Sequence, residues 1–145
     1  MSIETLPENM FYNIKYPFDR LPYKLNYIGY GVFSRTTFDF SELILPSTLK
    51  VIEPDAFYKS KGITNLIVPE SVRIIGDEAF AHMIDLKSIT FPVSADLGIS
   101  IVRHCPSLEE IHLTGLASSI EEDTIYDISE DVVFYIDRKA KKLGQ

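Results

Sequence analysis

The stretch VRIIGDEAFAHMIDLKSITFP, residues 72–92, decides the fold, because its apolar residues follow no single period. An amphipathic helix would repeat them about every 3.6 residues, and a half-buried strand would place them at every second position. Neither spacing holds over the whole stretch. It is therefore predicted to be a composite unit, in which a short helical turn around residues 77–80 precedes a strand that ends at Pro92.

The same unit recurs along the chain. The segment LPSTLKVIEPDAF (45–57) aligns with VPESVRIIGDEAF (68–80), and LPYKLNYIGYGVF (21–33) aligns with both. Weaker copies cover residues 97–113 and 120–136. Because one such unit cannot bury its own apolar face, we expect the units to stack and share one core. The prolines that mark the period are separated by 24, 23 and 23 residues: Pro22, Pro46, Pro69 and Pro92.

Each unit is expected to contribute one strand to a parallel sheet, with side chains alternating between core and solvent. Proline ends each strand, where it removes a backbone donor. Gly29, Gly76 and Gly98 occupy an equivalent corner of the return segment, where a residue without Cβ permits a sharp turn. The predicted inward residues at the strand centres are Leu43, Leu66, Ile89, Ile111 and Phe134.

The repeat resembles the BspA-type leucine-rich repeats, because VPESVRIIGDEAFAHMIDLKSITFP follows that family's consensus over a whole unit. The resemblance is strongest over residues 43–92 and extends over 21–136. It implies an α/β fold: a short right-handed leucine-rich-repeat solenoid of about five repeats, with a parallel concave β-sheet and short helical turns. We expect residues 1–20 to form an N-terminal cap or degenerate repeat, and residues 137–145 to form a basic C-terminal tail or cap.

Composition and charge exclude several classes of protein. The chain has 145 residues, of which 46% are hydrophobic and 24% charged, as in ordinary globular domains. No apolar run reaches the roughly 18 residues that cross a bilayer, and the N-terminal sequence lacks the features of an export signal. A cytoplasmic location is therefore expected, with a surface or virion-associated location as the alternative. A net charge of -7 argues against nucleic acid, because binding phosphates requires clustered cations.

A binding surface can be read across the repeats, because equivalent positions form columns in a stacked solenoid. Open repeat arrays bind through the exposed face of their sheet, so its outward column predicts a contact strip for a protein partner. The alternative explanation is that β-branched residues favour strands whether or not they bind anything. The predicted strip is Ile44, Ile67, Thr90, His112 and Tyr135, flanked by Glu42, Asn65, Ser88 and Glu110.

These columns predict a protein–protein interaction module that acts as an inhibitor or regulator of another protein, of phage or bacterial origin. The alternative is a structural or adhesive subunit of a cell-surface or viral assembly, which would form a homo-oligomer through sheet edges or exposed ends. No enzyme is expected, because the sequence lacks a phosphate-binding Gly loop, a nucleophile elbow and a paired-carboxylate motif. No cofactor is expected either.

A second column lies beside the predicted helical turns and consists of Arg35, Lys59, His82 and His104. It is interpreted as a solvated polar row or, alternatively, as a basic edge that meets an acidic partner. Cys105 is expected to pack as a small apolar residue and not to act as a nucleophile. No metal site is expected, because His82, His104 and Cys105 lack companions at ligand spacing.

Overall fold

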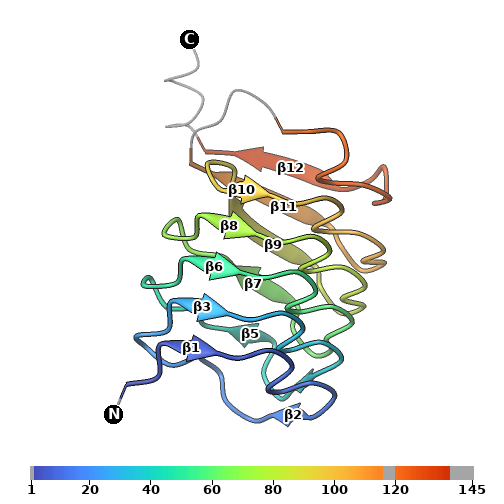
Figure 1. Ribbon diagram of the computed structural model, residues 1–145. Helices are drawn as coiled ribbons and strands as arrows, with labels where there is room; N and C mark the ends of the chain where they lie inside the picture. The colour runs from blue at the N-terminus through green and yellow to red at the C-terminus, as the bar shows by residue number, and fades with distance from the viewer. Residues whose placement is uncertain (1, 116–119, 138–145) are drawn as a thin grey trace.

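The computed structural model describes residues 2–115 and 120–137, which wind into a stack of coils (Figure 1). Each coil runs along one parallel sheet, turns, and returns along a second parallel sheet behind it. Figure 1 shows the front strands running left to right, the rear strands running right to left, and the chain rising from the N-terminus. This path is a right-handed solenoid, as predicted.

Two sheets of five strands form the solenoid, and all neighbouring strands within them are parallel. The long sheet, which is the sheet predicted from the repeats, contains β5 (Glu42–Leu43), β7 (Asn65–Ile67), β9 (Ser88–Pro92), β11 (Glu110–Thr114) and β12 (Val133–Ile136). The short sheet contains β1 (Thr5–Leu6), β3 (Tyr27–Ile28), β6 (Val51–Ile52), β8 (Ile74–Ile75) and β10 (Asp96–Leu97). A further parallel pair is formed by β2 (Lys15–Tyr16) and β4 (Thr37–Phe38).

The core lies between the two sheets and is continuous from coil to coil. Most of the predicted inward residues of the long sheet are buried, and the short sheet supplies Ile28, Ile52 and Ile75 from the other side. Between them runs a column of phenylalanines, in which the ring of Phe57 stacks on Phe33 at 5.1 Å and on Phe80 at 5.7 Å. All three rings are fully buried. The expectation of one shared core is therefore confirmed.

The predicted helical turns are wrong: the described residues contain no helix. In this segment, alternate N–H groups donate to the next coil instead of to a carbonyl four residues earlier. Phe57 N–H donates to Ala79 O at 2.7 Å and Lys59 N–H to Ala81 O at 3.0 Å, whereas Tyr58 N–H closes a local turn onto Asp55 O at 3.1 Å. Because the ladder between coils takes every second donor, no run of helical hydrogen bonds can form.

No strand was predicted in the return segment, but the structure contains one in most coils. Its central pair of residues forms the strands of the short sheet, with the second residue of the pair turned inward. Each strand is only two residues long, so no alternation is visible in the sequence.

The glycine corner is explained by close contact between coils. A Cβ on Gly76 would lie 2.3 Å from Pro54 N, and one on Gly98 would lie 2.6 Å from Asp77 N. A Cβ on Gly29 would meet Leu6 O at 2.8 Å. These positions require glycine because the backbone of the preceding coil occupies the space of a side chain.

The prediction that Phe134 points into the core is wrong. Its side chain is 44% exposed, and all four residues of β12 are exposed. The physical reason is its place in the sheet, because β12 is the terminal strand and pairs only with β11 among the described strands. A residue at this register position is buried only when another coil covers it.

The N-terminal residues take part in the same architecture. β1 pairs with β3 in the short sheet, and β2 pairs with β4. Residues 5–16 therefore follow the path of a repeat. The predicted basic tail begins at Asp137, and its residues 138–145 lie outside the described part of the chain. Within the described ranges, no helix has the length and apolar character required to cross a membrane.

Candidate functional site

The predicted contact strip lies in register on the outer face of the long sheet. Ile67 pairs with Thr90, Thr90 pairs with His112, and His112 pairs with Tyr135. Ile44 precedes Ile67 in the same column, because Leu43 pairs with Leu66 one position earlier. The structure therefore brings these five side chains together from five successive coils, while the alternate residues Leu43, Leu66, Ile89 and Ile111 point into the core.

The N-terminal half of the strip is apolar and open to solvent. The side chains of Ile44 and Ile67 are 53% and 58% exposed, on adjacent strands. Beside them, the amide nitrogen Nδ2 of Asn65 donates to Oε1 of Glu42 at 3.4 Å. These groups line a hollow that has both polar and apolar side chains. Its volume is about 230 Å³, and it is lined by Glu42, Leu43, Ile44, Leu45, Asn65, Ile67 and Pro69.

The C-terminal half of the strip is aromatic. The rings of His112 and Tyr135 stack face to face, with centroids 4.5 Å apart and an interplanar angle of 8°. Nε2 of His112 lies 3.0 Å from Oε2 of Glu110, a member of the flanking column. Ser88 and Asn65 pair in the same flanking column. This half offers flat aromatic area and a carboxylate, which suit a polar or aromatic partner side chain.

The second column, on the turns that follow the short sheet, holds its residues in the left-handed region. Arg35, Lys59, His82 and His104 have φ values of 61°, 58°, 58° and 49°. Non-glycine residues enter this region rarely, and β-branched residues pay the largest steric penalty there. The backbone thus selects unbranched side chains at the column and directs them outward from the turns.

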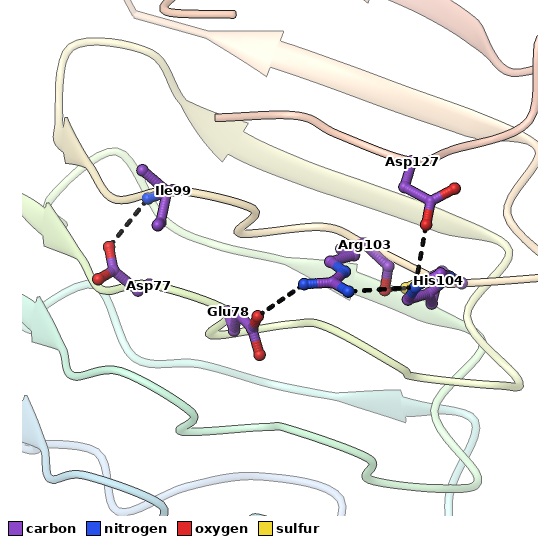
Figure 2. Close-up of polar contacts among 7 residues, drawn as sticks. Asp77, Glu78, Ile99, Arg103, His104 and Asp127 are labelled. Carbon is purple, nitrogen blue, oxygen red and sulfur yellow. Dashed lines mark hydrogen bonds and ion pairs between the residues drawn. The ribbon is translucent and has the colours of Figure 1, made fainter. Parts of the chain in front are cut away.

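The C-terminal end of this column contains a network of ion pairs (Figure 2). Nη1 of Arg103 lies 3.1 Å from Oε1 of Glu78, and Nε2 of His104 lies 2.9 Å from Oδ2 of Asp127. Burial lowers the pKa of His82, and the positive charges of His104, Lys59 and Arg103 lower it further. His82 is therefore less readily protonated than a free histidine, and the permanent positive charges of the column are those of Arg35 and Lys59.

Cys105 is a packing residue. Its side chain is only 6% exposed, and its thiol donates to Phe80 O at 3.3 Å. Burial raises the pKa of the thiol to about 11, so the thiolate form is scarce near neutral pH. It faces a hollow of about 550 Å³ that is also lined by His82, His104 and Asp127. Across residues 2–115 and 120–137, no cluster of three His, Cys, Asp or Glu side chains is arranged to hold a metal ion.

Comparison with known families accounts for this architecture. The model of the BspA-type leucine-rich repeat region matches residues 2–137 in six copies. The chain belongs to this family. The BspA-type repeats thus include the N-terminal residues that the sequence analysis assigned to a cap or degenerate repeat. No curated protein matches the chain by sequence.

Three solved structures are similar to this chain in fold. The pneumococcal vaccine antigen PcpA superimposes with a TM-score of 0.74 at 25% identity, over 97% of this chain and 38% of PcpA. The T. pallidum leucine-rich repeat protein TpLRR gives 0.57 at 20% identity, over 77% of this chain and 52% of that one. A leucine-rich repeat protein from Bacteroides ovatus gives 0.52 at 15% identity, over 86% and 45%. The chain spans about half or less of each protein's length.

Sequence reasoning found the strip on the long sheet because strand residues repeat at a clear spacing. It missed the grouping of Asn13, Lys61 and Ile84 with the second column, although these residues line one hollow with Arg35, Lys59 and His82. The signal was available in part, since Lys61 and Ile84 each lie two positions after a column residue.

Proposed function

We propose that this BspA-type repeat protein is a protein-interaction module that binds its partner through the outer face of the long sheet. In this proposal it serves as an inhibitor or regulator of the bound protein and carries out no catalysis. The observation that supports it most directly is the exposure of Ile44 and Ile67 side by side above a hollow of about 230 Å³.

The face has the composition of a contact surface. Exposed apolar groups at its centre would lose contact with water on binding, which is the main favourable term in protein association. Glu42 and Glu110 at its flank can fix the orientation of a partner through hydrogen bonds. The five strands are held in register by backbone hydrogen bonds, so little ordering entropy opposes binding.

The test begins with affinity capture from lysate of the native host and identification of bound proteins by mass spectrometry. The same capture is then repeated with Ile67→Lys and His112→Lys baits. We expect both substitutions to abolish retention of the partner, because each places a charge in the strip. Ile67→Lys should change the free energy of unfolding by less than about 0.5 kcal/mol, as for other exposed positions. His112→Lys also removes the stacking on Tyr135, so it should cost up to about 1 kcal/mol.

Ile74→Lys provides the matched control. Ile74 is also an exposed strand isoleucine, at 44% exposure, but it lies on the short sheet. A partner retained by the Ile74→Lys bait and lost from the Ile67→Lys bait supports the proposal. Equal retention of the partner by both baits would show that the long sheet is not the binding surface.

A structural or adhesive subunit is the second candidate function. It is favoured by β12, where Val133, Phe134, Tyr135 and Ile136 are 50%, 44%, 46% and 60% exposed on the terminal strand of the sheet. Such a strand could pair with another copy. Light scattering would then give a defined oligomer, whereas a regulator that acts on another protein would be monomeric alone.

A further inference from the structure

A hollow lies on the edge of the solenoid where the chain turns from the short sheet toward the long sheet. It has a volume of about 280 Å³ and draws residues from four successive turns. We call it the basic hollow; it is lined by Asn13, Arg35, Lys59, Lys61, His82 and Ile84.

The cations of the basic hollow have no counter-ion among the residues that the structure describes. Over the described residues, no carboxylate lies within ion-pair distance of Arg35, Lys59 or Lys61. Most other Lys and Arg side chains of the described residues also lack an ion pair, so these three are distinguished by their position around one hollow. Three such cations around one hollow create a local positive potential on an acidic protein.

Acidic groups in the same turns are engaged elsewhere. Oδ2 of Asp85 accepts the Gly62 N–H at 2.8 Å, and Glu78 pairs with Arg103. The lowered pKa of His82, which results first from burial and then from the neighbouring cations, is consistent with a positive environment.

The backbone holds the hollow independently of its side chains. Arg35 N–H donates to Tyr58 O at 2.7 Å, and Lys59 N–H donates to Ala81 O at 3.0 Å. Lys61 forms a parallel bridge with Thr37. These backbone bonds do not use the charged ends of Arg35, Lys59 and Lys61. Nζ of Lys59 lies 5.4 Å from the centroid of the Tyr58 ring.

We propose that the basic hollow is a docking site for an acidic segment of a partner protein, and that its cations bind carboxylates of that segment. Arg35 presents a planar guanidinium that matches a carboxylate through two hydrogen bonds. The hollow also contains apolar surface, because Ile84 lines it and is 47% exposed. A peptide with both acidic and apolar side chains satisfies both features.

A polyphosphate or nucleic acid is disfavoured as the ligand. A long polyanion would extend past the hollow onto the rest of the surface, where the net charge of -7 would repel it. Such a ligand also has no apolar group to contact Ile84. This proposal concerns a different face from the long sheet and does not depend on the function proposed for that sheet.

The test uses a short fluorescein-labelled peptide in which Glu alternates with Leu, with a Gln-for-Glu peptide as its neutral counterpart. Fluorescence anisotropy at low salt measures binding to the whole chain. We expect the Glu peptide to bind, and the Lys59→Glu/Lys61→Glu variant to weaken its binding by at least about tenfold. The Gln peptide should show no binding, because it cannot pair with the cations.

A second charge-reversed variant, Lys50→Glu/Arg73→Glu, changes the net charge by the same amount. Lys50 and Arg73 precede β6 and β8, at the opposite end of the short strands from the basic hollow. We expect this control to change peptide affinity by less than about twofold. Similar losses in the two variants would show binding to net charge alone and would overturn the proposal.

Two further measurements distinguish the classes of ligand, and distinguish the basic hollow from the long sheet as the binding surface. If inorganic polyphosphate binds and the Glu peptide does not, the proposal of an acidic peptide is wrong. The Ile67→Lys variant should bind the Glu peptide as wild type does, so failure of the long-sheet proposal would leave this result unaffected. Circular dichroism melting should show that each charge-reversed variant remains folded.

Discussion

Replacing Phe57 by alanine should test whether the column of stacked rings holds the coils together. Phe57 is fully buried and its ring packs against Phe33, Phe80 and Phe38, at 5.1, 5.7 and 6.2 Å. Truncation of a buried Phe costs about 3–5 kcal/mol, a range that already includes the packing of the ring, and these three aromatic contacts place Phe57 in its upper part. We therefore expect Phe57→Ala to lose about 4–5 kcal/mol of unfolding free energy.

The loss can be measured by urea unfolding, followed by circular dichroism because the chain contains no Trp. Phe11→Ala is the matched control: Phe11 stacks on Phe33 at 5.4 Å but is only partly buried, at the end of the column. It should lose about 1–2 kcal/mol. Equal losses at the two positions, or a loss below about 1 kcal/mol for Phe57→Ala, would refute the idea that a central coil depends on both neighbours.

Two further predictions concern the glycine corner and the thiol. Gly76→Ala should destabilise the fold by about 1–3 kcal/mol in the same urea assay, because its Cβ would lie 2.3 Å from Pro54 N; an unchanged midpoint would mean that the coils can separate without cost. Cys105 should react slowly with a disulfide reagent at pH 8 in the folded state and rapidly in urea, because burial raises its pKa to about 11. Since the folded pKa is above the ordinary value of 9.0, the stability contributed by the neutral thiol is complete below about pH 9 and is lost as pH rises through about 11. Fast labelling of the native chain at pH 8 would contradict the buried placement.

The sequence predicted the parts of the fold that repeat at fixed spacing. Leu43, Leu66, Ile89 and Ile111 are buried in one column, and the strands of the long sheet pair in the expected parallel register. The prediction of helical turns was wrong. Residues such as 77–80 favour a helix locally, but their backbone groups form hydrogen bonds with other coils instead of within a helical turn. Helix propensity is a weak guide to local structure where hydrogen bonds between distant residues determine it.

The remaining differences have the same origin in contacts between distant residues. Phe134 matches the inward pattern but lacks a covering coil in the described structure, so its burial could not be read from its spacing. The position of the contact strip followed from strand alternation. The basic hollow did not, because Lys61 and Asn13 become neighbours only when successive turns are laid on one another.

The ladder of N–H donors from each turn to the next has a mechanical consequence. Every coil is joined to its neighbours through backbone groups, as Lys59 is to Ala81, while bonds within a coil close short turns, as Tyr58 does onto Asp55. A pulling force along the stack should therefore detach one coil at a time, starting from an end of the solenoid. Amide hydrogen exchange should follow the same order, fastest at β12 and slowest around β6 and β8, whose partners are present on both sides.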